Sequence, residues 1–264
     1  MAIAVAVGGL AIVAAGLAIR YTSLEPALDL EPVYALVGTS YGVLLAILVL
    51  FASQHYTDAI QHAEEEATGL NDIYKAVGPL EPGDRDRVRH EIVCYAREKI
   101  SDEWPLLRES DGNGSPLVFA RTRQLNQTIE SLVRKYERRG NLLSDELLHY
   151  SLIRAEGRQL VLSDSRPRVP PALWVVVFLG LAIVVFLLAV GYWHRRAHAV
   201  TALGITLLLL VSMVGTIAEL DRPFGAIAGI KPTSMETVLT AVVDSSGGGK
   251  QALRPCEPPP GAPA

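Results

Sequence analysis

Residues 40–74 read SYGVLLAILVLFASQHYTDAIQHAEEEATGLNDIY, an apolar run that continues without a proline into a polar and acidic stretch. At helical spacing, Val43, Ile47 and Phe51 fall on one face of this segment. Continuing along the chain at that spacing adds three polar side chains to the same face, namely His55, Asp58 and His62. The stretch therefore predicts one long helix that leaves a lipid bilayer, with an apolar face that turns polar where the lipid ends.

The composition places this helix in a membrane protein. The chain has 264 residues, of which 50% are hydrophobic, and the apolar residues are concentrated in four runs separated by polar segments. That distribution is typical of transmembrane spans joined by soluble connections. The net charge of -4 gives no indication of a nucleic-acid partner. We therefore predict an all-α integral membrane protein with four transmembrane helices and a large helical insert between the second and third.

The four apolar runs occupy residues 2–19, 33–53, 172–193 and 199–218. The first run could also be a cleaved signal peptide, but no lysine or arginine precedes it, which favours a retained span. The short turn HRRAH predicts that the last two spans form an antiparallel hairpin. The predicted regions are transmembrane helices 1 and 2 (1–53), a helical insert (54–170), a transmembrane hairpin (171–218), a turn with a short helix (219–244) and a disordered tail (245–264).

The insert has the pattern of a helical domain. Apolar residues recur at helical spacing among paired charges, and no alternation of apolar and polar residues indicates a strand. The expected helices cover residues 54–77, 84–104, 117–138 and 144–162. After the last span, Thr233 and Glu236 form a capping box that predicts a short helix to residue 243. The Gly- and Pro-rich composition beyond it predicts disorder.

Basic residues near the spans predict the orientation in the membrane. In a four-span layout, the termini and the insert lie on one side of the bilayer, and more basic residues lie on that side. It holds Arg154, Arg158, Arg166, Arg168, Arg222 and Lys231, whereas the other side holds Arg20, Arg195 and Arg196. We therefore expect a multi-pass protein of the cell membrane whose termini and residues 54–170 are cytoplasmic.

Two segments resemble a known family. The stretch LLAILVLFASQHYTDAIQHAEEEA at 44–67 resembles the second helix of bestrophins, and DRPFG at 221–225 resembles the turn that follows their transmembrane region. Together with the layout, they make the chain similar to the bacterial bestrophin-like domain family. The Arg-Trp-Trp run of bestrophins is absent, and Ala59, Ile60 and Gln61 stand near its place. The acidic calcium clasp is also missing, so the resemblance does not imply calcium gating.

The resemblance implies a pentameric ion channel, chiefly anion-selective, whose second helices line the pore. Its neck would be formed by Val43, Ile47 and Phe51. From their own chemistry, His55, Asp58 and His62, with Glu66 one turn further on, could form a cation site or a pH-sensitive vestibule. The partners implied are the lipid bilayer, further copies of the chain and inorganic ions. The alternative function is a non-conducting membrane scaffold or sensor whose cytoplasmic helical domain binds a protein.

Each of these sites also has a plain structural interpretation. The apolar stripe could be lipid-facing or packed against other helices, since every span is apolar. The polar residues that follow it could form a solvated helical face. The turn after the last span could serve only to fix the chain's exit, because proline restricts φ and glycine permits tight turns; its residues are Asp221, Pro223, Phe224 and Gly225.

No pattern indicates an enzyme, a metal or a cofactor. Glu146 and His149 match one half of a di-iron motif, but the sequence contains no second Glu-x-x-His. Neither a nucleophile elbow, a phosphate-binding loop nor an HExxH motif occurs. Cys94 and Cys256 are far apart in the sequence, which favours two free thiols.

Overall fold

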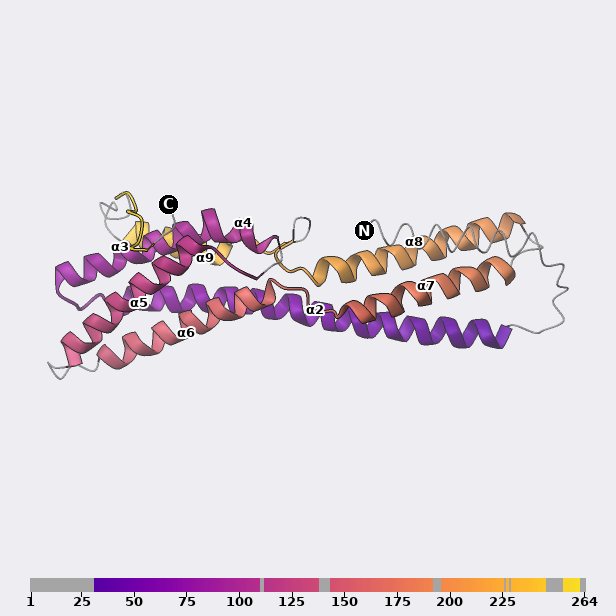
Figure 1. The fold of residues 1–264 in the computed structure, drawn as a ribbon, viewed down its shortest axis with the longest axis horizontal. Coiled ribbons are helices and arrows are strands. Elements are labelled where there is room, and N and C mark those ends of the chain that lie inside the picture. Colours follow the sequence, from indigo (N-terminus) through magenta and orange to yellow (C-terminus); the bar gives the residue numbers. More distant parts are fainter. Residues whose placement is uncertain are drawn as a thin grey trace. The chain divides into compact units, whose positions relative to one another are not determined.

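The computed structural model describes residues 31–109, 112–137, 143–191, 196–225, 227, 229–245 and 254–261. Within these residues every regular element is a helix, which confirms the all-helical prediction. The expected first span, residues 2–19, lies outside the described residues. The elements are α2 (Glu31–Ala76), α3 (Pro82–Glu98), the π-helical η1 (Lys99–Glu103), α4 (Trp104–Leu107), α5 (Pro116–Glu137), α6 (Leu143–Asp164), α7 (Pro171–Gly191), α8 (Arg196–Leu220) and α9 (Thr233–Ser245) (Figure 1).

The chain divides into two compact units. The first contains Met1–Gln54 and Arg168–Asp221, and the second contains His55–Pro167 and Arg222–Ala264. Helix α2, drawn in indigo and purple in Figure 1, is continuous over 46 residues and contributes to both units. It begins beside Pro32 and ends just before Gly78 and Pro79, close to where these helix-breaking residues predict its end.

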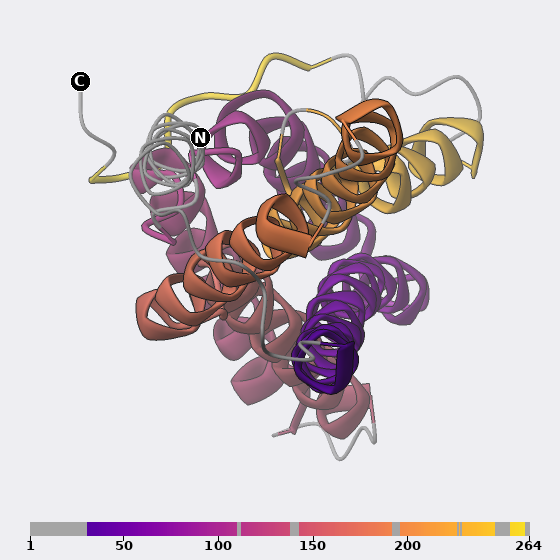
Figure 2. The same cartoon turned by 90° about the vertical axis from the view of Figure 1, so that its right-hand side faces the viewer.

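The first unit packs the first half of α2 against α7 and α8 (Figure 2). The buried residues of its apolar cluster are Tyr41, Leu45, Leu48, Ala52, Val177 and Ile217. The Tyr41 hydroxyl donates a hydrogen bond of 2.9 Å to the Val177 carbonyl. Gly180 leaves room for the Tyr41 ring, because a Cβ at that position would clash with it. The close approach of α2 and α7 therefore depends on the pairing of the large Tyr41 side chain with Gly180, which has no side chain.

Two of the described helices are long and apolar enough to cross a membrane. They are found within Pro32–Ala76 and Pro171–Leu188, and a further apolar helix, Gly204–Leu220, is shorter. These three segments coincide with three of the apolar runs from which the spans are predicted.

The second unit is a helical domain built from the second half of α2, α3, α5, α6 and α9. Figure 1 shows α5 running beside α6, and these helices share one apolar core. A smaller apolar cluster joins Ala59 and Ala63 of α2 to Trp104 and Phe224. The helix expected over residues 84–104 does not stop at Pro105, although a proline ring usually ends a helix. Pro105 instead occupies the first turn of α4, where a proline is tolerated.

Two glycines allow α2 and α6 to touch through their backbones. A Cβ on Gly69 of α2 would lie 2.7 Å from the backbone nitrogen of Arg154, and a Cβ on Gly157 of α6 would lie 2.7 Å from that of Glu66. Real Cβ atoms essentially never approach backbone this closely. The contact is one helical turn long, and it brings Arg154 and Glu66 into the interior of the domain.

We expect Gly69→Ala to lower the free energy of unfolding by about 1–3 kcal/mol, because an added methyl group forces the two helices apart. Alanine favours a helix by itself, so this loss would oppose the intrinsic preference. Denaturation of the full chain in detergent, followed by tryptophan fluorescence, would measure it. Gly83→Ala is the matched control, since nothing lies within 4 Å of its Cβ. Equal effects of the two substitutions would contradict the close contact.

The prediction of two free thiols is wrong. Cys94 of α3 and Cys256 form a disulfide, with their Cα atoms 5.5 Å apart. A separation of 162 residues hides this proximity from sequence reasoning. The structure also gives residues 254–261 a defined path, whereas their composition suggested disorder.

Candidate functional site

One face of α2 in the first unit is left uncovered by the residues that the structure describes. Val43, Ile47 and Phe51 expose 55%, 46% and 61% of their surface, respectively. The opposite face carries the buried residues of the first unit's core, including Leu45 and Leu48. The helix thus has two apolar faces, of which only one is used within the subunit.

The uncovered face continues along α2 through Leu50 and then through polar residues. Exposed positions follow at steps of three and four residues, and they are Leu50, Gln54, Thr57, Gln61, Glu64 and Thr68. Steps of three and four in alternation hold a stripe on one side of a helix, whereas each step of four advances about 40° around it. His55, reached from Val43 by three such steps, therefore lies about 120° away from it.

The structure accordingly places His55 off the exposed stripe, whereas Asp58 and His62 lie at its margin. His55 is buried and only 3% exposed, and Asp58 and His62 are half-buried. Within the second unit, His62 Nδ1 donates a hydrogen bond of 2.6 Å to Asp164 Oδ2. His55 Nδ1 lies 4.0 Å from the other oxygen of the same carboxylate. Asp164, at the end of α6, is fully buried and was not singled out from the sequence.

Two residues of the turn after α8 make contacts that hold the turn in place, one in each unit. In the first unit, the Asp221 carboxylate accepts hydrogen bonds of 2.9 Å from the backbone nitrogens of Arg168 and Val169. It thereby ties the segment before α7 to the end of α8. In the second unit, the Phe224 ring packs edge-on against Trp104, with ring centroids 5.5 Å apart.

Backbone hydrogen bonds close the rest of this turn. Gly225 donates to the Arg222 carbonyl at 2.8 Å, and Ile230 donates to the Pro223 carbonyl at 2.8 Å. Gly225 does not adopt a positive φ. The glycine on which the turn depends is Gly229, where a Cβ would clash with the Gly225 carbonyl.

A network of buried charges lies at the centre of the second unit. Lys99, within the π-helical segment, forms an ion pair with Glu66 at 3.0 Å and donates a hydrogen bond of 2.6 Å to Glu103, and none of these three side chains is more than 1% exposed. Arg158 of α6 donates to the second Glu103 oxygen at 2.5 Å. The backbone nitrogen of Ser115, at the start of α5, also donates to that oxygen, at 3.1 Å. Glu103 therefore joins three segments of the chain.

The other members of the network surround Glu66. The Tyr95 hydroxyl donates to the second Glu66 oxygen, and the Arg154 guanidinium lies 5.4 Å from the centre of the Tyr95 ring. Arg154 also donates to Asn126 at 2.5 Å. The network thus connects α2, α3, η1, α5 and α6, and the sequence analysis did not identify it.

The surroundings of these groups shift their pKa values. Burial by itself raises the pKa of Glu103, but Lys99 and Arg158 outweigh it and hold that pKa below its ordinary value. Burial and the Glu66 carboxylate raise the pKa of the Tyr95 hydroxyl well above its ordinary value. Glu103 is therefore ionised at neutral pH, whereas the Tyr95 hydroxyl keeps its proton and donates a hydrogen bond to Glu66.

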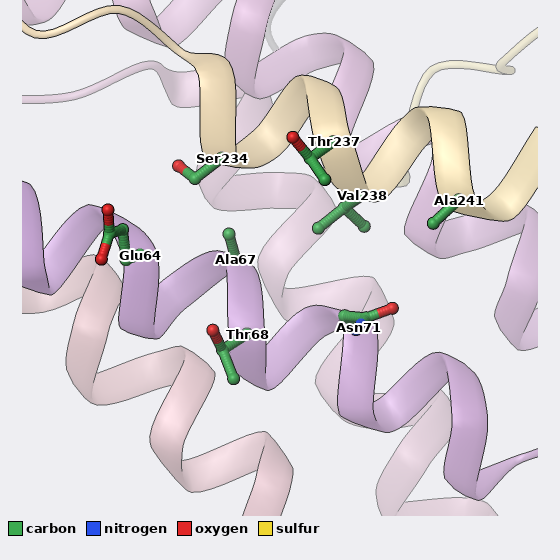
Figure 3. A pocket seen from close by; sticks show the side chains of 8 residues that line it. All are labelled: Glu64, Ala67, Thr68, Asn71, Ser234, Thr237, Val238 and Ala241. Atoms are coloured by element: carbon green, nitrogen blue, oxygen red, sulfur yellow. The ribbon is translucent and has the colours of Figure 1, made fainter.

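A shallow groove of about 330 Å³ runs between α2 and α9 in the second unit (Figure 3). Its walls consist of small or polar side chains at helical spacing. They are Glu64, Ala67, Thr68 and Asn71 of α2 and Ser234, Thr237, Val238 and Ala241 of α9. Within the described residues, no group of three or more His, Cys, Asp or Glu side chains could hold a metal ion.

Comparison with known proteins identifies the class to which this fold belongs. A model of the Bestrophin-like domain matches residues 2–235. No curated protein matches the chain significantly. Among solved structures, a single-residue variant of a bacterial bestrophin homologue from Klebsiella pneumoniae superposes with a TM-score of 0.70 at 15% identity, covering 92% of this chain and 97% of that one. Another crystal structure of the Klebsiella homologue, phased with zinc, gives 0.67 at 15% identity, with 93% and 96% covered.

The chain belongs to the Bestrophin-like domain family, as the resemblance of its second helix and its post-span turn indicated. The likeness to the solved structures extends over nearly the whole chain and shows that the fold is that of the bacterial bestrophin homologues. Bestrophin-like proteins are membrane proteins, and this chain is therefore a membrane protein.

Proposed function

We propose that this protein is a homo-oligomeric ion channel whose axial pore is lined by α2. The observation that carries the proposal is the uncovered stripe on that helix, because its subunit packs the opposite face and leaves Val43, Ile47 and Phe51 exposed. A ring of these side chains from several subunits would form the neck. The kinship with bestrophins, which are channels, supports a pentamer and favours anions as the permeating ions.

The chemistry of the stripe fits a gated path. Large apolar side chains around a narrow opening exclude water, and an ion cannot shed its hydration there cheaply. Beyond the neck, Gln54, Thr57 and Gln61 offer polar, uncharged side chains to a wider vestibule. The hydrogen-bonded His62 and Asp164 would stand behind this vestibule wall. Since the apolar part of the stripe carries no charge, selectivity would rest on backbone dipoles and the vestibule.

The proposal includes a four-span arrangement. The apolar run at 2–19, the first half of α2, α7 and α8 would cross the bilayer. The second unit would lie on the cytoplasmic side with both termini, as the distribution of arginine and lysine favours. The four spans of one subunit cannot enclose an axial pore, so an oligomer is essential to this function.

Purified protein should therefore have the mass of several 28.5 kDa chains once detergent is subtracted, and five by kinship with bestrophins. Light scattering coupled to size-exclusion chromatography would measure the protein mass of the complex. A monomer at working concentration would contradict a pore lined by α2. An oligomer that gives no ion flux in liposomes would instead support a non-conducting scaffold.

A further inference from the structure

The C-terminal segment is attached to the helical domain at one covalent and two non-covalent points. Cys256 is bonded to Cys94, in the middle of α3. The carbonyl oxygen of Glu257 accepts a hydrogen bond of 2.7 Å from Arg121 Nη2 of α5. Pro259 is buried. All of these residues belong to the second unit.

Among the described residues, the disulfide is the covalent bond that joins this segment to α3. Residues 254–261 contain four prolines and adopt no regular structure. Proline-rich segments of this kind lack internal hydrogen bonds, so their path is set by attachment to other parts of a protein. Arg121 also forms an ion pair with the buried Glu98 at 2.5 Å, so its charge has a partner outside the C-terminal segment.

We propose that the Cys94–Cys256 disulfide is a redox-sensitive latch, which holds the C-terminal segment on α3 and α5 when oxidised and releases it when a dithiol reductant opens the bond. Cys256 is half-buried, whereas Cys94 is fully buried. An incoming thiolate therefore reaches the Cys256 sulfur, and Cys94 is the leaving group. His90 Nε2 lies 3.6 Å from the Cys94 sulfur, where it can donate a hydrogen bond to the departing thiolate.

The reaction is a two-step thiol–disulfide exchange. In the first step, a reductant thiolate forms a mixed disulfide with Cys256, the Cys94–Cys256 bond breaks, and the Cys94 thiolate takes a proton from water. In the second step, the second thiol of the reductant attacks the reductant sulfur that is bonded to Cys256. This attack closes the reductant's own disulfide and releases the Cys256 thiolate, which is also protonated. Two electrons and two protons pass from the dithiol to the cysteine pair, and the reductant leaves as a disulfide.

The latch does not require that the protein conduct ions. The side of the membrane on which the second unit lies decides only whether the docked or the released state of the C-terminal segment prevails. Disulfides are rare in the cytosol, and those that form there are usually transient and redox-sensing. On the cytoplasmic side proposed above, the segment would be free in reducing conditions and would dock under oxidative conditions. Docking covers Arg121 and the surface around Cys94, whereas release leaves the segment tethered only through the residues that follow α9.

The bond itself can be tested by digesting the oxidised, full-length protein with trypsin without reductant. Residues 90–97 (HEIVCYAR) and 251–264 (QALRPCEPPPGAPA) should appear as one cross-linked species, since the proline after Arg254 blocks cleavage there. After treatment with dithiothreitol, each peptide should carry one free thiol. Separate thiol peptides from protein treated with a mild oxidant would overturn the proposal.

Release can be followed by the anisotropy of a fluorophore attached enzymatically to the C-terminus of the full chain. Anisotropy should be high in the oxidised protein and should fall on reduction, in step with the appearance of two thiols. The Cys256→Ser variant should give the lower value with or without dithiothreitol, and so should Cys94→Ser. An unchanged anisotropy in wild-type protein whose two thiols are shown to be free would mean that the segment stays docked without the bond, and would overturn the latch.

Discussion

Replacing Glu103 by glutamine is expected to destabilise the helical domain by about 3–5 kcal/mol, the usual cost of breaking a buried ion pair by removing one partner. Glu103 accepts hydrogen bonds from Lys99 and Arg158, and neither of these cations is more than 5% exposed. An amide removes the Glu103 counter-ion from both cations, so that Lys99 is left with Glu66 alone. It also offers only one acceptor oxygen in place of two, so Lys99 competes for it with Arg158 and the backbone of Ser115, which share the other oxygen of Glu103.

Thermal unfolding of the full chain in detergent would show this loss as a fall in Tm of roughly 10 °C. Glu130→Gln is the matched control, because Glu130 is an exposed glutamate in the same domain, and its substitution should change stability by less than about 0.5 kcal/mol. If Glu103→Gln behaves like this control, the ion pairs contribute little and the network does not hold the domain together.

Because the pKa of Glu103 is lowered in the folded domain, the stability of the domain should depend on pH. A carboxyl whose folded-state pKa lies below its unfolded-state value contributes stability above the unfolded value, and loses it as the pH falls through the folded value. The wild-type domain should therefore lose stability on acidification below the ordinary pKa of 4.5. Glu103→Gln should lose less over the same range, because it has no carboxylate to protonate at this position.

Replacing Ile47 and Phe51 together by alanine is expected to raise ion flux through reconstituted liposomes. Smaller side chains would widen and wet an apolar constriction, so that an ion keeps more of its hydration as it passes. A barrier lower by only about 1.4 kcal/mol corresponds to a tenfold faster passage. Because both side chains are about half exposed or more, the change should leave the stability of the subunit nearly unaltered.

The same pair of measurements separates the alternatives. Ile205→Ala with Leu208→Ala removes from α8 two apolar side chains that are at least as exposed as Ile47 and Phe51, and it should alter neither flux nor stability. If the α2 variant is less stable, on the order of a few kcal/mol, and flux stays at the background of empty liposomes, α2 is a packed helix. If neither quantity changes, the stripe faces lipid.

Helix positions could be predicted largely from local signals. Prolines and glycines mark most helix ends, and apolar residues at helical spacing mark the helices of the insert. The long α2 was recognisable because no proline interrupts it between Pro32 and Pro79. These features depend on residues that are neighbours in the sequence, so they can be predicted without knowledge of the packing.

The interior of the domain could not be predicted in the same way. Lys99 and Glu103 have the spacing of an ordinary surface ion pair, and only the packing of α2 and α6 places them inside. That packing depends on Gly69 and Gly157, which carry no hydrophobic signal. His55 was placed on the wrong face because repeated steps of four residues rotate around the helix. The disulfide joins residues whose proximity has no local cause.

The most direct test of the pore is a thiol block at the stripe. Ile47→Cys and, as control, Leu208→Cys would be compared in a background in which serine replaces both native cysteines, and chloride flux would be recorded before and after a membrane-impermeant methanethiosulfonate is added. Both positions are apolar and exposed in the subunit, with exposed fractions of 46% and 74%, respectively. If α2 lines the pore, the reagent should abolish flux through the Ile47→Cys channel and leave the Leu208→Cys channel unaffected. Flux that persists in the Ile47→Cys protein after its thiol is fully modified, or no flux above that of empty liposomes in any variant, would contradict it.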